Sequence, residues 1–426
     1  MSPISKASEA VRKVGFALAA AAALNLPLSA LPPAMMPQAD AALSAGVTNA
    51  KAILRNALPI KNKPIRQIQY ELESISEALR IPGSKSIGPI RKSVNKVETI
   101  LKKQRKEIEA SLADRDAGLA AIAALEASLK EFDGVIERED KQEVPIAQQK
   151  CLASVGDIEQ AMVAGFPYEV PSDYDNLPQL KGRAEMEMKV KFKTPRRDAT
   201  TGGTMKIVVD GYSAPVSAGA FVDLVARKFY DGMEIQRADG FVVQWGDPDG
   251  PAEGFVEPES KEIRRVPFEL LIRGEKTPTY ELTLEDLGRA DGRTEPVLPF
   301  SAYGTLAMAR AEFDNNSASS QVFALLKESE LTPTGANLLD GRYAVFGYIV
   351  ENSDMLVDTK VGDLIENITI TSGLENLINS AVTKKAAAAP APAPAPEPAP
   401  EPEAAPAEAA PAEAAPAEAE PAPAAE

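Results

Sequence analysis

The chain has 426 residues, of which 44% are hydrophobic and 5% aromatic, and it contains no histidine. This length is typical of two or three domains with sizeable cores, and the formal charge of −16 argues against nucleic-acid binding as a main role. The lack of histidine excludes Ser–His and Cys–His nucleophile systems and most catalytic zinc sites. The one cysteine, Cys151, excludes an internal disulfide.

Residues 1–41 have the pattern of an export signal. Three basic residues precede an alanine-rich apolar run at 14–31, and the small residues at 39–41 form a typical cleavage site. A transmembrane anchor is the alternative, but Pro27 interrupts the run, and a span needs ~20 apolar residues. We therefore predict cleavage and a mature chain that begins near Ala42.

Residues 42–165 predict four amphipathic helices, with a hinge near Pro82, that form an up-and-down bundle. The apolar stripes recur at three- and four-residue steps: Ile65, Ile68, Leu72, Ile75 and Leu79; Ile90, Val94, Val97, Leu101 and Ile108; Leu119, Ile122, Leu125 and Leu129; Ile146, Cys151, Val155, Ile158 and Met162. The stripes fill the bundle's own core in one interpretation, and in the other they serve a docking or regulatory module.

A basic cluster lies on the second of these helices. It consists of Arg91, Lys92, Lys96, Lys102, Lys103, Arg105 and Lys106. Such a cluster suits contact with an acidic lipid surface or an acidic partner, but a run of charges on a helix is also typical of a solvated face.

Residues 166–181 are acidic and contain proline, which indicates a linker, and from residue 182 the pattern changes to short strands. The expected strands are at 186–192, 205–209, 241–243, 304–308, 321–325 and 345–350, with a helix that begins near Pro215. Residues 257–299 interrupt this series as an insertion. The chain is therefore expected to be α+β, with a helical bundle followed by a closed antiparallel β-barrel at 182–378.

Three stretches of the β region place a few polar groups among apolar ones, which suits a shallow apolar pocket with a cation at its rim. They are IQRADGFVVQWGD at 235–247, LAMA with SQVF at 306–309 and 320–323, and LLDGRYAVFG at 338–347. Together they resemble, in order and in spacing, the three signature motifs of the cyclophilin family. The resemblance covers residues 182–378.

The resemblance implies peptidyl-prolyl cis-trans isomerisation, which breaks no bond and therefore needs no nucleophile, general base, metal or cofactor. It assigns catalytic roles to Arg237, Gln244, Phe241 and Phe323, with Gln244 holding the arginine. It assigns substrate binding to Val242, Ala309, Arg310, Ala311, Gln321, Leu338, Leu339 and Tyr343.

The chain departs from the family's motifs at several of these positions. Gln236 and Tyr343 stand where the family has histidines, Leu338 replaces a tryptophan that favours cyclosporin binding, and Arg310 replaces an asparagine. The loop before Phe241 is one residue shorter. These changes leave open whether the isomerase activity is full, weak or lost.

The bundle and the export signal narrow the resemblance to the large multidomain thylakoid-lumen cyclophilins of plants and algae. This group implies a protein of the thylakoid lumen that supports folding, assembly and maintenance of photosystem II, and we expect a monomer. Its expected partners are proline-containing clients, including photosystem II subunits, with peripheral membrane contact and no nucleic acid. Two alternatives remain: a non-catalytic scaffold or chaperone that binds partners through its bundle, and a cyclophilin of the bacterial periplasm.

The tail at 386–426 contains only alanine, proline and glutamate. This composition cannot form a packed core, so we predict a disordered segment. It serves as a solubilising tail, as an acidic spacer for a basic partner, or as a source of X–Pro bonds for the chain's own pocket.

Overall fold

The computed structural model describes residues 47–80, 87–196, 198–327 and 338–383, which all belong to one compact unit. The predicted export signal, the hinge near Pro82 and the acidic tail lie outside the described residues. Within the described part, no helix has both the length and the apolar character needed to span a bilayer.

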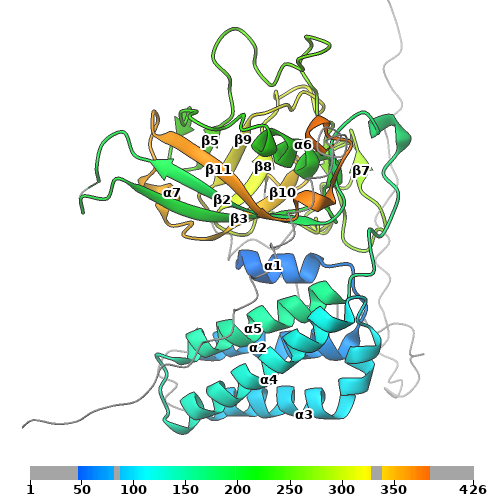
Figure 1. The fold of residues 1–426 in the computed structure, drawn as a ribbon, viewed down its shortest axis with the longest axis vertical. Coiled ribbons are helices and arrows are strands. Elements are labelled where there is room, and N and C mark those ends of the chain that lie inside the picture. Colours follow the sequence, from blue (N-terminus) through cyan, green and yellow to red (C-terminus); the bar gives the residue numbers. More distant parts are fainter. Residues whose placement is uncertain (1–46, 81–86, 197, 328–337, 384–426) are drawn as a thin grey trace, which may run out of the picture. The chain divides into compact units, whose positions relative to one another are not determined.

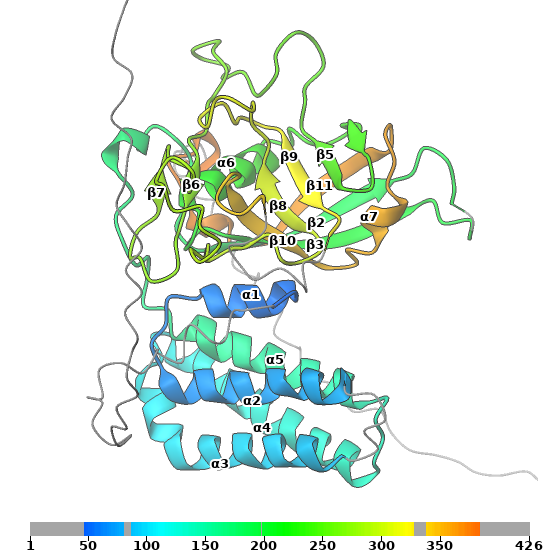
Figure 2. The same ribbon diagram turned by 180° about the vertical axis from the view of Figure 1, so that it is seen from behind.

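Four long helices lie side by side and share one apolar core (Figures 1 and 2). They are α2 (Lys63–Arg80), α3 (Gly88–Ala110), α4 (Arg115–Glu137) and α5 (Val144–Ala161). The Asp114 side chain caps α4 by accepting the backbone N–H of Ala117 at 3.0 Å, and a proline occupies the first turn of both α3 and α5. The predicted four-helix core is therefore confirmed.

The predicted stripe on the last of these helices is wrong at its first position. Ile146 is 62% exposed, whereas Val144 and Ala147 are buried in the core. The helix begins at Val144, so the 3.6-residue period places Ile146 on the outer face. Leu119 of α4 is only half-buried.

A short helix, α1 (Ala50–Ala57), was not predicted as a separate element. The side chain of Asn49 caps it by accepting the N–H of Ala52 at 3.0 Å. Its apolar residues Ile53 and Leu54 belong to a cluster with Phe300 and Tyr348 of the β region, and not to the four-helix core.

The β region is organised around one curled antiparallel sheet of eight strands (Figure 2). The strand order is β11 (Leu364–Ser372), β2 (Arg183–Lys191), β3 (Gly202–Asp210), β10 (Val345–Glu351), β8 (Thr305–Met308), β9 (Val322–Leu325), β5 (Val242–Trp245) and β4 (Arg237–Ala238). The prediction of a closed barrel is wrong. The edge strands β11 and β4 do not form a continuous ladder. Residues 232–235, before β4, meet residues 362–365 through an isolated bridge between Glu234 and Leu364 and a few backbone hydrogen bonds, such as that from the Ile365 N–H to the Met233 carbonyl at 2.8 Å.

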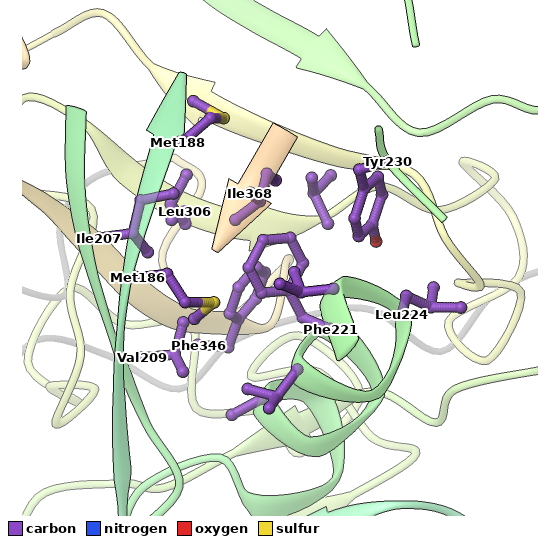
Figure 3. Close-up of a cluster of buried hydrophobic side chains, with 14 of the residues drawn as sticks. Met186, Met188, Ile207, Val209, Phe221, Leu224, Tyr230, Leu306, Phe346 and Ile368 are labelled. Carbon is purple, nitrogen blue, oxygen red and sulfur yellow. The ribbon is translucent and has the colours of Figure 1, made fainter. Parts of the chain in front are cut away.

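The helix α6 (Pro215–Ala226) packs against the sheet and completes its core. Figure 3 shows Phe221 of α6 pointing into a cluster with Phe346 of β10 and Met186 of β2, and Leu224 belongs to the same core. The rings of Phe221 and Phe346 are 5.1 Å apart at their centroids. The predicted helix after Pro215 is therefore confirmed.

Short elements complete the domain. They are β1 (Gln179–Leu180), which pairs with β12 (Leu377–Ile378), the helix α7 (Met355–Asp358), the 3-10 turns η3 (Ser172–Tyr174) and η4 (Leu374–Asn376), and the paired strands β6 (Glu269–Leu270) and β7 (Thr279–Tyr280). The last two strands lie in the segment predicted as an insertion.

One buried carboxylate fastens this insertion to the core. Glu269 of β6 accepts the backbone N–H groups of Val216 and Ser217, at 3.1 and 2.9 Å, and thereby caps the first turn of α6. Burial raises the pKa of Glu269 to about 7, although these hydrogen bonds oppose the shift.

Candidate functional site

A pocket of about 340 Å³ brings together residues from all three sequence motifs. Its predicted members are Arg237, Phe241, Val242, Gln244, Ala309, Arg310, Ala311, Gln321, Phe323, Leu339 and Tyr343. Leu338 does not line the pocket, and it is 81% exposed. The structure therefore assembles every predicted site residue except Leu338.

The alternation of side chains along β5 and β9 creates the apolar floor of the pocket. Val243 and Ala324 point into the core beneath α6, whereas their neighbours Val242 and Phe323 belong to the cluster on the other face of the sheet. Alternate side chains of each strand therefore pack into the core beneath α6, and the side chains between them face the pocket.

Phe323 is the centre of this floor. Its ring stacks on Phe300 with centroids 6.0 Å apart and meets Tyr343 edge-on at 5.4 Å. Phe323 is only 6% exposed, so it is both a packing residue and a lining residue. Phe241 stands at the edge, 37% exposed, with the ammonium of Lys327 lying 5.5 Å from its ring centroid.

Arg237 forms the cationic rim and is paired with a carboxylate. It lies on β4 opposite Gln244 of β5. Its Nε donates to Asp239 Oδ2 at 2.7 Å, and its Nη2 lies 2.6 Å from the same oxygen. The side chain remains 52% exposed, so its N–H groups are accessible to a peptide.

The shortened loop places Asp239 where it can hold this arginine. The other carboxylate oxygen of Asp239 accepts the N–H groups of Val242 and Phe241, both at 3.0 Å. The hydrogen bond from Val242 is the largest of the effects that lower the pKa of Asp239 to about 2, so this carboxylate is charged at neutral pH. Sequence reasoning missed Asp239, although it lies only two positions after Arg237.

Gln244 was expected to hold Arg237, but its side chain binds Gln321 instead. The Gln244 amide donates to Gln321 Oε1 at 2.9 Å, and Gln321 in turn donates to Asp247 Oδ1 at 3.0 Å. Gln244 therefore belongs to a chain of amides along one side of the pocket, while Asp239 takes the arginine.

Gly246 allows the strand to leave this corner. Its φ is +101°, and a Cβ there would lie 2.3 Å from the carbonyl oxygen of Ser320. Its own carbonyl accepts the Ser320 hydroxyl at 2.7 Å. The Gly-Asp pair of the first motif thus has a structural purpose and positions Asp247 beside Gln321.

The pocket lining also includes Arg310 and four residues that the motifs did not reveal. Arg310 Nε donates to the Arg342 carbonyl at 2.9 Å, and its guanidinium lies 5.1 Å from the Tyr343 ring centroid. The missed lining residues are Glu253, Arg265, Ser317 and Ser319. They come from loops outside the quoted motifs, so the sequence offers no local signal for them.

The site contains the groups that a peptide ligand needs. It has an apolar floor for a proline ring and amide and guanidinium donors for backbone carbonyls. Isomerisation of an X–Pro bond requires no acid–base pair, because no bond is broken. In the described residues there is no group of three or more cysteine, aspartate or glutamate side chains that could hold a metal ion.

Comparison with known families agrees with this geometry. Residues 196–372 match the family described as cyclophilin type peptidyl-prolyl cis-trans isomerase, and residues 49–163 match the PsbQ-like domain described for CYP38-like isomerases. The chain is 48% identical over 377 residues to the chloroplastic peptidyl-prolyl cis-trans isomerase CYP38 of Arabidopsis thaliana, with 86% of this chain and 85% of that protein covered. The chain belongs to the cyclophilin family.

Two further peptidyl-prolyl cis-trans isomerases are similar to most of this chain. A Synechocystis protein, provisionally named a thylakoid lumen peptidyl-prolyl cis-trans isomerase, is 43% identical, with 82% of this chain and 89% of that protein covered. The chloroplastic CYP37 of Arabidopsis thaliana is 32% identical, with 83% and 76% covered. These relatives place this cyclophilin in the thylakoid lumen, as the export signal and the resemblance predicted.

One solved structure is similar to part of this chain. The crystal structure of a Cryptosporidium parvum cyclophilin, obtained with the dipeptide Ala-Pro, is 20% identical with a TM-score of 0.29. It covers 44% of this chain and 99% of its own.

Proposed function

We propose that this cyclophilin binds proline-containing segments of client proteins in the thylakoid lumen and isomerises their X–Pro bonds. The pocket supports this because one cavity joins an apolar floor, Phe323 and Val242, to an accessible guanidinium, Arg237. The clients we propose are subunits of photosystem II during assembly and maintenance, with the protein acting as a folding factor.

The chemistry follows from amide resonance. The barrier of ~18–20 kcal/mol arises because a planar amide loses its resonance when it twists, and the proline nitrogen then regains a lone pair. A guanidinium N–H directed at that nitrogen is a stronger partner for the twisted amide than for the planar one, so it lowers the barrier. The Phe323 floor holds the proline ring while the preceding residue rotates.

Replacement of Arg237 tests the catalytic part of this proposal. A hydrogen bond to a charged group contributes about 1.5–3 kcal/mol, so Arg237→Ala is expected to lower kcat/KM for an X–Pro peptide by about 10- to 100-fold. The measurement is isomerisation of a short peptide by the full-length protein. Arg138→Ala is the matched control. Arg138 is an exposed arginine of the bundle region, is paired with Glu143 and does not line the pocket. Equal activity of the wild type and Arg237→Ala would contradict the catalytic role.

A scaffold function is the second candidate, and one observation favours it. Arg237 already has a carboxylate partner, Asp239, which competes with a substrate for its N–H groups. If assembly depends on binding alone, Arg237→Ala should restore photosystem II assembly in cells that lack this protein. If assembly depends on isomerisation, the variant should leave that assembly defective while accumulating to the normal level.

A further inference from the structure

Two arginines that line the pocket, Arg265 and Arg310, have no role in the isomerisation chemistry. Ser317 links their segments, because its hydroxyl accepts the Ala311 N–H at 2.8 Å, and we call this part of the lining the arginine wall. Arg310 follows β8, and Arg265 lies between two isolated bridges, Val256–Ile263 and Val266–Ala318. The second bridge aligns Arg265 with the segment that contains Ser317, and Arg265 Nη1 donates to the Ser317 carbonyl at 2.6 Å. Both arginines are thus held in place by backbone contacts.

These two guanidinium groups donate hydrogen bonds to neutral backbone carbonyl oxygens. Arg310 donates to the carbonyl oxygens of Arg342, Ala311 and Glu312, at 2.9, 2.8 and 3.0 Å, and Arg265 to that of Ser317. Arg237 differs, because it is bound to the Asp239 carboxylate. The wall therefore presents positive charge that these contacts do not neutralise.

The acidic groups near the pocket are fewer than the basic ones or are already bound. Asp247, beside the pocket, accepts a hydrogen bond from the Gln321 amide at 3.0 Å. Among the lining residues of the described chain, Glu253 is the acidic one, set against Arg265 and Arg310 once Arg237 and Asp239 are counted as a pair. Asp286, which lies near Arg310, is already bound by Thr283 and Asn315. Lys327 adds a further cation at the edge beside Phe241.

We propose that this wall selects proline segments with a glutamate or aspartate close to the proline. The inference deepens the proposed function, since it names the substrate class of the same pocket, but it concerns binding and does not require catalysis. Guanidinium groups bind carboxylates through charge-assisted hydrogen bonds. Arg265 and Arg310 line the same pocket as the apolar floor that would hold the proline ring. A lysine near the proline would be repelled.

The chain itself contains sequences of this class. Its last segment, 386–426, consists only of alanine, proline and glutamate, and it includes the pairs Glu397–Pro398, Glu401–Pro402 and Glu420–Pro421. An acidic X–Pro ligand can therefore come from a client or from this tail, and the chemistry of recognition is the same for both sources.

Peptide binding to the full-length protein tests the inference. The probe is a labelled peptide with the sequence of residues 395–403, APEPAPEPE, compared with versions in which every glutamate is glutamine or lysine. Exposed charge pairs have modest strength, so the glutamate peptide should bind about 5- to 20-fold more tightly than the glutamine peptide at low salt, and less so at high salt. The lysine peptide should bind most weakly.

Variants then locate the selectivity. Arg265→Gln should lower the preference for glutamate by about two- to fivefold, and Arg265→Glu should shift it toward the lysine peptide. Arg310→Gln removes the second charge, but it also removes the contact to Arg342, so Arg265 carries the decisive test. Arg138→Gln is the matched control and should leave the preference unchanged.

The outcomes separate this inference from the proposed function. If glutamate and glutamine peptides bind equally, or if the preference survives Arg265→Glu, the acidic selectivity is wrong while the proline pocket stands. If no peptide binds at all, both proposals fail. A chain that ends at Thr383 distinguishes the sources: tighter binding of the probe than in the full-length protein identifies the tail as a competing ligand, and unchanged binding assigns the selectivity to clients.

Discussion

The bundle and the β region build their cores in opposite ways. In the bundle, core residues are close in sequence and recur within each helix, from Ile65 to Met162. In the β region, one cluster joins Met186 and Ile368, which lie on strands from the two ends of the domain. Local periodicity therefore determines the bundle, whereas the β core and its pocket depend on pairings between distant segments.

The two regions also differ in what their outer surfaces contain. The bundle's apolar side chains serve its core, and Ile146 stands on the outside. In the β region, the second face of β5 and β9 carries another apolar cluster, and part of that cluster lines the pocket. Strands β5 and β9 can therefore pack one face into the core and line a pocket with the other. A helix with a single apolar stripe uses that stripe for its core.

The largest expected effect tests whether the two regions are energetically separate. Phe132 is fully buried in the bundle core, and Phe132→Ala should lower the free energy of unfolding by about 3–5 kcal/mol because it leaves a cavity. Peptide affinity at the pocket of the folded protein should not change. Denaturant unfolding and peptide titration measure the two quantities.

Ile146→Ala is the control for this prediction. Because Ile146 is 62% exposed, its truncation should change the free energy of unfolding by less than about 0.5 kcal/mol. A loss of peptide affinity in Phe132→Ala at conditions where the protein is folded would show that the bundle core and the pocket are coupled.

The same contrast explains what the sequence could predict. The stripes place Leu72, Val97 and Leu125 correctly because helix period alone decides which face is buried. The motifs place Arg237 and Phe323 in one pocket because a family resemblance carries long-range pairing that periodicity does not.

Other features depended on tertiary contacts that no local pattern records. The strand β11 and the open edges of the sheet were not predicted, since pairing between β11 and β2 joins the two ends of the domain. Arg265 lines the pocket because the bridge between Val266 and Ala318 and its own hydrogen bond to the Ser317 carbonyl hold it beside a segment that is distant in sequence. Asp239 was missed because Gln244 was expected to hold Arg237. In the structure, Asp239 of the shortened loop accepts the hydrogen bond from Arg237 instead.

A smaller effect concerns a buried acid of the bundle. Glu159 is fully buried, and its Oε1 accepts from Arg66 Nη1 at 3.2 Å. Burial raises the pKa of Glu159 to about 7, although Arg66 and Arg55 oppose the shift. The folded protein therefore takes up a proton that the unfolded chain, with its ordinary glutamate, has already lost.

The sign of the pH dependence follows from this difference. A raised pKa in the folded state contributes stability at low pH, and this contribution is lost as the pH rises from about 4.5 to about 7. Glu159→Gln should remove roughly 2–3 kcal/mol of that decrease, measured as the free energy of unfolding at pH 5 and pH 8. Part of the decrease should remain, because the pKa of Glu269 in the β region is also raised to about 7.

Glu131→Gln is the matched control, since Glu131 is an exposed glutamate paired with Lys150 on the neighbouring helix. It should leave the pH dependence unchanged. An unaltered slope in Glu159→Gln would mean that this carboxylate remains charged in the folded protein across the whole range.

The smallest expected effect is at the rim of the pocket, where Asp239 holds Arg237. Asp239→Asn keeps an oxygen that can accept the N–H groups of Phe241 and Val242, but it removes the charge that binds the guanidinium. Since the pair is half-exposed, its release should raise kcat/KM for an X–Pro peptide by only about two- to fivefold. Salt should raise the rate of the wild type more than that of the variant, because salt weakens the same pair.

The double variant Arg237→Ala with Asp239→Asn decides how this carboxylate acts. If Asp239 competes with the substrate for the N–H groups of Arg237, its replacement should not change the rate once Arg237 is absent. A lower rate in Asp239→Asn alone would reverse the interpretation, because the carboxylate would then orient the guanidinium toward the peptide. The shortened loop would in that case be an adaptation that supports isomerisation, whereas a higher rate would make it the feature that restrains this cyclophilin relative to a rim with an unpaired arginine.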